Sequence, residues 1–368
     1  MAWKPFYLTE NVTKTMLLGI HAPYNHTTDI DAYFEEFKNL VKANRGHYEE
    51  EKYIKIRTID SAFFITRGKL SELADFAKAH NIQEVIVSEA LTAQQERNLN
   101  QFFGCTIIDR THLILDIFEK AAHSAEGKKQ VEIAKLQYQK TRVAGKGVEM
   151  SQQSGIFGTR GPGETAKEKE LRHINHLIQR LRKELTKLQE VRSTQRKQRL
   201  RSGEPQIALI GYTNAGKSTI LNALAKTDVL AEDKLFATLD TTTRALWIDS
   251  KKIGLISDTV GFIQQLPHQL IAAFKSTLAE LQFADLLLHV VDLADKNWEH
   301  HIKVVHDILE ELGVHKEMLY VFNKADKIDN IDELSGKLSA YQPHVIISSK
   351  SKETMKPLID FLIGWHHQ

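Results

Sequence analysis

The stretch "GYTNAGKST", residues 211–219, joins an apolar run, "QIALI", to a segment with helical periodicity. It fits the pattern G-x-x-x-x-G-K-[ST], in which glycines let successive backbone N–H groups turn toward phosphate oxygens. The lysine of this pattern reaches the β and γ phosphates, and the hydroxyl after it is a ligand for Mg²⁺. The strand, loop and helix together predict a nucleotide-binding site at Gly211, Tyr212, Thr213, Asn214, Ala215, Gly216, Lys217, Ser218 and Thr219.

Two further segments could complete the phosphate and metal chemistry. "KKIGLISDTVG" is typical of a strand that ends in an acidic residue, where Asp258 can hold Mg²⁺ through water and the N–H of Gly261 can sense the γ phosphate. Upstream, "LFATLDTTTR" offers Thr238 as a second Mg²⁺ ligand, with Thr242 and Thr243 as alternatives. The predicted metal ligands are Ser218, Thr238 and Asp258, and the predicted catalytic residues are Lys217, Thr238 and Gly261. The predicted nucleotide contacts in these segments are Phe236, Ala237, Thr238, Leu239, Asp240, Asp258, Thr259, Val260 and Gly261.

The segment "MLYVFNKAD" indicates which base is bound. It ends in the tetrapeptide NKAD, which begins 65 residues after Asp258. A carboxylate accepts hydrogen bonds from both N1–H and the 2-amino group of guanine, and adenine lacks that pair of donors. Asp326 therefore favours guanine, so GTP and GDP are the predicted ligands and an ATPase is disfavoured. The predicted contacts around the base are Asn323, Lys324, Ala325, Asp326 and, after the apolar run "HVIIS", Ser348, Ser349 and Lys350.

Loops of this kind need a sheet whose strands end at one edge. Residues 202–368 are therefore predicted to form a Ras-like P-loop domain with a mostly parallel sheet and helices near 218–226, 270–282, 298–312 and 353–364. Residues 1–122 alternate apolar runs with helical patterns, which predicts a separate small α/β domain. Its predicted strands are "TMLLGIHA", "YIKIRTI", "AFFIT", "EVIVSEA" and "CTIID", and residues 29–44 are predicted to form a helix capped by Asp29. "TRGK", residues 66–69, is interpreted as a turn into a helix rather than an anion site.

Residues 123–201 are predicted to form an antiparallel helical hairpin with a glycine-rich loop at its tip. Six glycines lie between residues 145 and 163, beside Arg160. The second helix carries apolar residues at alternating spacings of three and four, the pattern of a coiled-coil seam: Leu171, Ile174, Ile178, Leu181, Leu185 and Leu188. Its predicted partner is the helix around Val131, Ala134 and Tyr138. Residues 164–201 hold twelve Lys or Arg against five Glu, which suits either a solvated helix face or contact with phosphates.

The composition bounds the class of protein. The chain has 368 residues, 42% of them hydrophobic and 26% charged, and its net charge is only +2, so general attraction to nucleic acid is not expected and DNA is not a predicted partner. No apolar run approaches the roughly 20 residues of a membrane helix, and the amino terminus lacks a secretory signal. With Cys105 as the single cysteine, a cytoplasmic monomer is predicted, and peripheral membrane association stays open.

The segments quoted above, with "DTVGFIQQLPH", "ADLLLHVVD", "DRTHLILDIF" and "GTRGPGE", resemble the ribosome-associated GTPases of the HflX family over about residues 80–330. This resemblance implies a protein that binds the large ribosomal subunit and its ribosomal RNA and splits stalled or idle ribosomes. It also implies that the hairpin and Arg160 reach toward ribosomal RNA. Some members of the family accept ATP through the amino-terminal domain, and whether this chain does so stays open. Three features depart from the family: Thr241 replaces a proline, "SSKSKE" replaces Ser-Ala and a glycine loop, and no further domain is expected after Gln368.

Two positions bear on the mechanism. Phe262 follows Gly261, where many small GTPases have the glutamine that orients water, so slow intrinsic hydrolysis and stimulation by a partner are expected. Asn214 could help to recruit K⁺, and an ordinary variable loop position is an equal alternative. Two other functions remain open: a nucleotide-dependent protein that remodels structured RNA, and a regulatory module that holds GTP but scarcely hydrolyses it.

Overall fold

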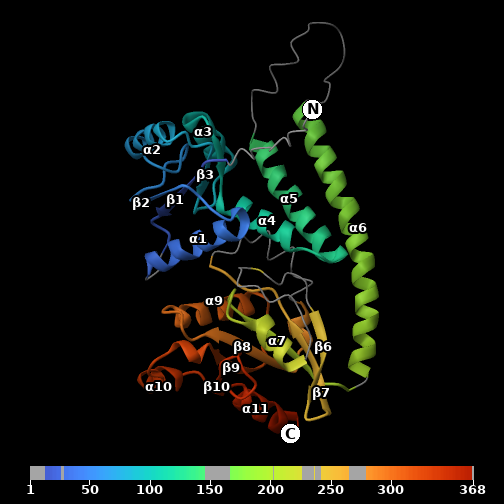
Figure 1. The fold of residues 1–368 in the computed structure, drawn as a ribbon. Coiled ribbons are helices and arrows are strands. Elements are labelled where there is room, and N and C mark those ends of the chain that lie inside the picture. The colour runs from blue at the N-terminus through green and yellow to red at the C-terminus, as the bar shows by residue number, and fades with distance from the viewer. Residues whose placement is uncertain are drawn as a thin grey trace, which may run out of the picture. The chain divides into compact units, whose positions relative to one another are not determined.

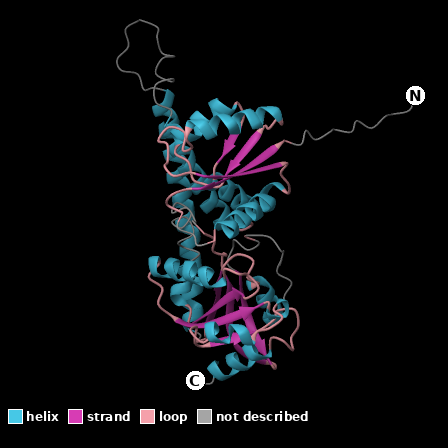
Figure 2. Ribbon diagram, turned by 90° about the vertical axis from the view of Figure 1, so that its left-hand side faces the viewer, coloured by secondary structure: helices cyan, strands magenta, loops and turns pink. Residues whose placement is uncertain are grey.

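The structure is a computed structural model that describes residues 13–25, 29–145, 166–201, 203–225, 236, 242–264 and 279–366 (Figure 1). The chain divides into two compact units, one of residues 1–114 with 141–158 and one of residues 115–140 with 159–368. Each unit has its own β-sheet covered by helices, parallel in the first unit and mostly parallel in the second (Figure 2). The predicted α/β architecture, with a helical hairpin between an amino-terminal sheet and a nucleotide-binding sheet, is confirmed.

The first sheet has four parallel strands in the order β2-β1-β3-β4. Its elements are β1 (Thr15–His21), α1 (Ile30–Arg45), β2 (Glu50–Lys55), α2 (Arg67–Ala79), β3 (Glu84–Val87), α3 (Ala93–Phe103), β4 (Thr106–Ile108) and α4 (Arg110–Ala121). Successive residues of a strand point to opposite faces. Met16 and Leu18 therefore share a core with α2 and α3, while Gly19 faces α1. A Cβ at Gly19 would lie 3.0 Å from the Phe34 ring and 2.4 Å from that of Tyr53, so this close packing needs glycine.

The predicted helix after Asp29 is confirmed as α1, and Asp29 caps it by accepting a hydrogen bond from Ala32 N at 3.0 Å. The predicted strand "AFFIT" is wrong, because residues 62–66 form a turn and the start of a loop. Phe64 has a φ of 66° and exchanges two backbone hydrogen bonds with Asp60. Phe64 and Ile65 are buried, so the apolar run covers the core as a turn and not as a strand.

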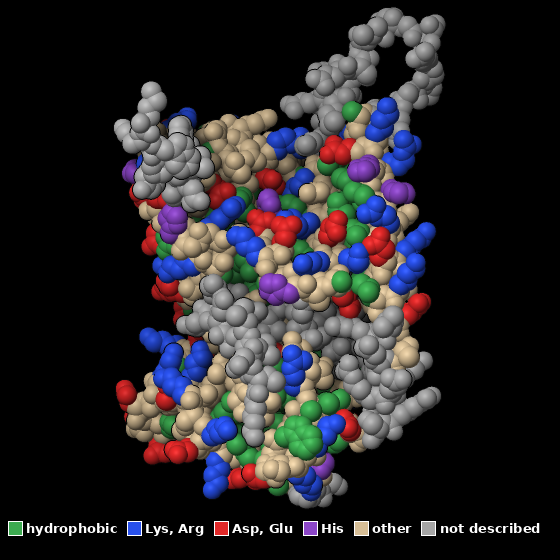
Figure 3. Space-filling view, turned by 45° about the vertical axis from the view of Figure 1, so that its right-hand side comes forward, with side chains coloured by type: hydrophobic (Ala, Val, Ile, Leu, Met, Phe, Trp, Pro, Cys, Tyr) green, Lys and Arg blue, Asp and Glu red, His purple; other side chains and the backbone are tan. Residues whose placement is uncertain are grey.

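The hairpin consists of α5 (Ala125–Gly145) and α6 (Ala166–Arg201), which lie side by side (Figure 1). Ile174, Ile178 and Leu181 of the predicted seam are buried, as are the predicted partners on α5, Val131, Ala134 and Tyr138. An ion pair joins Lys129 of α5 to Glu184 of α6. Basic side chains stand exposed along α6 (Figure 3): Lys169, Arg172, Arg180, Arg182, Lys183 and Lys187. The glycine-rich loop and Arg160 lie outside the described residues.

The second sheet has six strands in the order β10-β9-β8-β5-β7-β6, and β6 alone in this order runs antiparallel to its neighbour. Its elements are β5 (Gln206–Gly211), α7 (Lys217–Ala225), β6 (Thr242–Ile248), β7 (Lys251–Asp258), β8 (Leu286–Asp292), α9 (Trp298–Glu311), β9 (Glu317–Asn323), α10 (Ser335–Leu338), β10 (His344–Ile346) and α11 (Lys356–His366). The predicted helices near 218–226, 298–312 and 353–364 are confirmed as α7, α9 and α11. Of the helix predicted near 270–282, only a 3₁₀ turn at 279–283 falls within the described residues.

Two cores hold this sheet in place. Apolar residues of β5, β7, β8 and β9 pack on one face with α7 and α11, and Val291 and Phe322 pack with Trp298 and Ile302 of α9. Parallel β5, β7, β8 and β9 all end at one edge of the sheet. The loops that follow them therefore converge there, as the sequence predicts for a site made from strand ends.

Candidate nucleotide-binding site

The loop between β5 and α7 has a backbone that only glycine tolerates at two points. Gly211 has a φ of 145°, and a Cβ there would lie 2.2 Å from the carbonyl oxygen of Val290. Gly216 has a φ of 98°, and a Cβ would lie 2.2 Å from Nδ2 of Asn323. Asn214, at the exposed tip, has a φ of 60°, a left-handed conformation that asparagine adopts more readily than most residues. The loop can therefore curl tightly into the amino end of α7, where backbone N–H groups favour anions.

Lys217 begins α7 and is 6% exposed. Its Nζ donates hydrogen bonds to the carbonyl oxygens of Gly211 at 3.1 Å and Tyr212 at 2.8 Å, so the side chain folds back over the loop. Burial lowers the pKa of Lys217 to about 8, and nearby Asp258 opposes part of that effect. A phosphate beside this amine would favour its charged form.

Ser218 and Asp258 meet across the strand end. The Oγ of Ser218 donates to Oδ2 of Asp258 at 2.6 Å, and Asp258 is fully buried at the end of β7. Thr259, the next residue, donates its hydroxyl to the carbonyl oxygen of Leu209 at 2.7 Å and so fixes β7 against β5. A hydroxyl and a carboxylate in contact are hard oxygen donors of the kind that Mg²⁺ prefers.

The segment after Asp258 runs along the phosphate loop. Phe262 N donates to the carbonyl oxygen of Gly211 at 3.2 Å, and Thr213 N donates to that of Phe262 at 2.8 Å. A Cβ on Gly261 would lie 2.7 Å from Cγ2 of Thr213 and 3.1 Å from Nζ of Lys217. Gly261 therefore lies directly beside the lysine amine, and Phe262 is 1% exposed.

The predicted base-recognition residues also lie together. Asn323 Nδ2 donates to the carbonyl oxygen of Ala215 at 2.9 Å, and Asn323 Oδ1 accepts from Ser349 N at 3.0 Å. The carboxylate of Asp326 accepts from the Ser348 hydroxyl at 2.6 Å and pairs with Lys350 Nζ at 2.5 Å. The hydrogen bond from Lys350, followed by that from Ser348, lowers the pKa of Asp326, so its acceptor form persists.

Lys324 is held by a partner that the sequence reasoning missed. Its Nζ pairs with Oδ2 of Asp292 at 2.7 Å, and its backbone has a φ of 61°. Ala325 N donates to the carbonyl oxygen of Ile347 at 3.1 Å, which ties the loop to the end of β10. Asp292 ends the apolar run "ADLLLHVVD", and a carboxylate at the end of a predicted strand could have indicated this ion pair.

The residues predicted from "LFATLDTTTR" are mostly outside the described part of the chain. This applies to Ala237, Thr238, Leu239 and Asp240. Phe236 is described and is 3% exposed. The alternatives Thr242 and Thr243 begin β6, where they pair with Asp258 and Ser257 of β7. Thr219 is exposed on α7, and Val260 is buried next to Gly261.

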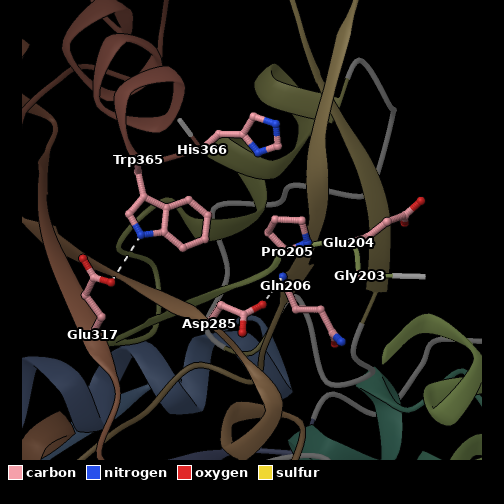
Figure 4. A pocket seen from close by; sticks show the side chains of 8 residues that line it. All are labelled: Gly203, Glu204, Pro205, Gln206, Asp285, Glu317, Trp365 and His366. Atoms are coloured by element: carbon pink, nitrogen blue, oxygen red, sulfur yellow. Dashed lines mark hydrogen bonds between the residues drawn. The ribbon is translucent and has the colours of Figure 1, made fainter. Parts of the chain in front are cut away.

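A separate cavity of about 520 Å³ lies at the opposite edge of the sheet, where β5, β8 and β9 begin (Figure 4). Trp365 Nε1 donates to Glu317 Oε2 at 3.2 Å, and Gln206 N donates to Asp285 Oδ2 at 2.8 Å. Both hydrogen bonds join residues that line the cavity to each other. The predicted nucleotide residues do not line this cavity.

Among the described residues, no helix has the length and apolar character that crossing a bilayer requires.

Comparison with known families matches three consecutive parts of the chain. Residues 31–119 match the GTP-binding GTPase amino-terminal family, residues 121–199 the GTP-binding GTPase middle region, and residues 206–324 the 50S ribosome-binding GTPase family. A solved complex of the protein SsGBP with GDP shares the fold, with a TM-score of 0.53 and 24% identity over 96% of this chain and 99% of that one.

Relatives in two bacteria are similar over most of the chain. The GTPase HflX of Caldanaerobacter subterraneus subsp. tengcongensis is 44% identical over 307 residues, 83% of this chain and 70% of the relative. The GTPase HflX of Escherichia coli is 42% identical over 314 residues, 85% of this chain and 74% of the relative. The phosphate loop, the strand-end carboxylate and the NKAD loop thus occur in a chain that belongs to the HflX family of P-loop GTPases.

Proposed function

We propose that this GTPase binds the large ribosomal subunit, hydrolyses GTP when the subunit stimulates it, and splits stalled or idle ribosomes. The observation that carries the proposal is the convergence of the phosphate loop, Asp258 and Asp326 at one sheet edge in a chain matched to 50S ribosome-binding GTPases over residues 206–324. Such an edge provides a nucleotide-controlled switch. The exposed basic residues of α6 provide a surface for ribosomal RNA.

In this proposal Asp326 reads the guanine edge. Ser348 and Lys350 keep its carboxylate ionised and oriented, and guanine N1–H and the 2-amino group would take over as donors. Asn323 holds the phosphate loop through Ala215 and the closing loop through Ser349, so it braces both sides of the nucleotide. Lys324, fixed by Asp292, supplies its aliphatic stem to the base.

Ser218 and Asp258 would hold Mg²⁺, with Thr238 as the third protein group. The contact between the Ser218 hydroxyl and the Asp258 carboxylate fits that role, since both groups offer oxygen ligands at the phosphate loop. When bound, Mg²⁺ neutralises phosphate charge. Lys217 holds the β and γ phosphates, and the N–H of Gly261 senses the γ phosphate from its place beside Lys217. A K⁺ ion near Asn214 belongs to the same proposal, and equal turnover in K⁺ and Na⁺ would remove it.

Hydrolysis without a partner should be slow, because Phe262 is an apolar, buried side chain and cannot orient water. A partner that supplies the missing stabilisation can raise such rates by roughly 10³ to 10⁵. We propose that the large subunit is this partner, in the cytoplasm, and that the protein acts as a monomer. Ribosomal RNA would contact the basic face of α6 and the loop that contains Arg160. The same basic face supports the alternative, a nucleotide-dependent protein that remodels free structured RNA.

The test is steady-state GTP and ATP hydrolysis by the full chain alone, with large ribosomal subunits, and with protein-free RNA of matched charge. The proposal predicts strong GTP turnover with subunits only. Equal stimulation by bare RNA would favour the remodelling protein, and no stimulation by either would favour a regulatory GTP-binding module.

A charge variant sharpens this experiment. Changing Arg180, Arg182 and Lys183 on α6 to Gln should reduce stimulation by subunits and leave basal turnover within about twofold, since phosphate contacts act on binding. The matched control changes Lys296, Lys303 and Lys316, which are exposed in the nucleotide-binding domain, to Gln. Equal losses in both triple variants would show a general charge effect and remove the assignment to α6.

A further inference from the structure

Tyr212, the second residue of the phosphate loop, joins three separate segments. Its ring stacks on that of His301 in α9, with centroids 3.8 Å apart and an interplanar angle of 8°. Its hydroxyl oxygen accepts a hydrogen bond from the backbone N–H of Gln264 at 2.7 Å. Tyr212 and Gln264 are each 7% exposed, so this contact is buried. The side chain thus connects the phosphate loop, α9 and the segment after Gly261.

The contact with Gln264 continues a short ladder between the two loops. Tyr212 and Phe262 form a parallel bridge, and the backbone of Phe262 bonds to Gly211 and Thr213 on either side of Tyr212. The Tyr212 hydroxyl adds a bond two residues further along. A buried N–H needs an acceptor, so loss of this hydroxyl weakens the hold of the phosphate loop on the Gln264 backbone. The bonds around Phe262 also fix Gly261 at its place beside the Lys217 amine.

We propose that Tyr212 is a positioning residue for GTP hydrolysis, which holds the Gly261–Gln264 segment against the phosphate loop. The stack with His301 fixes the direction of the Tyr212 ring, and the hydroxyl fixes the backbone of Gln264. This inference rests on the role proposed above for the Gly261 N–H at the γ phosphate. Sub-ångström displacement of a group that contacts the reacting phosphate lowers the rate, because catalysis depends on such positioning.

The selective effect on hydrolysis follows from what each nucleotide contains. GDP has no γ phosphate, so its affinity does not depend on where Gly261 lies. Tyr212→Phe keeps the ring and its stack on His301 but removes the acceptor for Gln264. The single-turnover rate of GTP hydrolysis should therefore fall by roughly 5- to 20-fold while the Kd for GDP changes by less than about twofold. His301→Ala should lower the same rate to a smaller extent, since it removes only the support of the ring.

Tyr320→Phe is the matched control, because it deletes a hydroxyl in the same domain that bonds to Nε2 of His306 at 3.0 Å. Its hydrolysis rate and GDP affinity should both stay within about twofold of the unmodified protein. The three variants are compared by quenched-flow hydrolysis, fluorescent GDP titration and thermal unfolding, all with the full chain and without ribosomal subunits.

An unchanged hydrolysis rate in Tyr212→Phe would overturn the inference. So would equal losses of rate, GDP affinity and thermal stability, since they would show a purely structural role for the side chain. If Tyr212→Phe fails to fold, His301→Ala decides by the same criteria. The proposed function fails in a different measurement, the stimulation of the unmodified protein by large subunits, so the two failures are distinguishable.

Discussion

The parallel sheet of the first unit and the mostly parallel sheet of the second both carry polar groups where their parallel strands end, yet these groups are arranged differently. In the first sheet, Glu89 follows β3 and is fully buried. One of its oxygens accepts from the hydroxyl of Tyr33 at 2.9 Å, and the other accepts from that of Tyr24. Burial raises the pKa of Glu89, and these hydroxyl donors oppose that effect. The carboxylate at this edge thus serves as an internal acceptor.

The neighbouring strand end of the first sheet follows the same principle. Asp109, after β4, accepts from Leu91 N at 3.0 Å and His112 N at 2.8 Å, and pairs with Arg142 at 2.8 Å. Side chains and backbone of the same compact unit, which includes residues 141–158, therefore supply its donors.

The second sheet instead brings bare backbone to its edge. Gly211, Gly216 and Gly261 each leave no room for a Cβ, so peptide N–H groups can approach a ligand closely. The carboxylates here accept from short hydroxyls, Asp258 from Ser218 and Asp326 from Ser348, and Asp326 also pairs with the exposed Lys350; a ligand can replace these donors. Comparison of the edges teaches that strand-end carboxylates alone do not mark a site, whereas carboxylates combined with glycines under steric constraint do.

The largest effect is expected from a substitution of Lys217 at the nucleotide-binding edge of the second sheet. Lys217→Ala should weaken GTP and GDP binding by about 100-fold or more, because it removes a charge-assisted contact to the phosphates. Fluorescent nucleotide titration measures this change. The matched control is Lys69→Ala, because Lys69 also donates to a carbonyl oxygen, that of Lys55 in the first sheet. If Lys69→Ala weakened binding as much, "TRGK" would be a phosphate site after all and the contrast between the edges would fail.

A smaller effect concerns His289, which is buried inside the second sheet on β8 with no hydrogen-bond partner among the described residues for either ring nitrogen. Burial, then His306 and Lys217, lowers its pKa to about 3. Because the unfolded chain binds a proton near pH 6.5 and the folded chain does not, stability falls as pH drops from that value. Between pH 7.5 and pH 5 this costs roughly 2 kcal/mol.

His289→Leu should remove that part of the pH dependence, measured by urea unfolding at both pH values. Tryptophan fluorescence reports mainly on the nucleotide-binding domain, which holds Trp247, Trp298 and Trp365 of the four tryptophans. His173→Leu, at an exposed position on α6, is the control and should keep the pH dependence. If the free energy of unfolding changed equally with pH in the His289 variant and the unmodified protein, this imidazole would not be held neutral.

The smallest effect on activity is expected at the first edge. Glu89→Gln should lower the free energy of unfolding by about 1–2 kcal/mol, since a neutral amide with one acceptor oxygen replaces a carboxylate that accepts from both Tyr33 and Tyr24. GTP turnover should stay within about twofold. A loss of turnover beyond the loss of folded protein would show that the first edge takes part in the chemistry, and the two edges would no longer differ as described.

The sequence located most strands of both sheets, although the predicted strand "YIKIRTI", residues 53–59, overlaps β2 only at residues 53–55. Apolar runs predicted β1 and β5, which are buried along nearly their whole length, and β7 and β9, which are buried mainly toward their carboxyl ends. The same signal failed at residues 62–66, since a buried turn needs apolar residues as much as a strand does. The left-handed backbone of Phe64 distinguishes the turn from a strand, and a phenylalanine in the sequence gives no sign of that conformation.

Contacts between distant segments explain what the sequence could not predict at the site. The motifs identified Lys217, Asp258 and Asp326 because spacing within one loop defines their chemistry. The partners of Lys324 and Tyr212 lie 32 and 52 residues away along the chain, at Asp292 and Gln264. Such pairs depend on the order of the strands in the sheet, and no local pattern in a single sequence predicts that order.

The ratio of GTP turnover with large ribosomal subunits to turnover without them tests the central claim most directly. Small subunits at equal concentration serve as the control for RNA, and Lys217→Ala gives the background. The account predicts a ratio of at least about 10³ with large subunits and a ratio near one with small subunits. Equal ratios for the two subunits, or turnover by the protein alone at the stimulated rate, would contradict it.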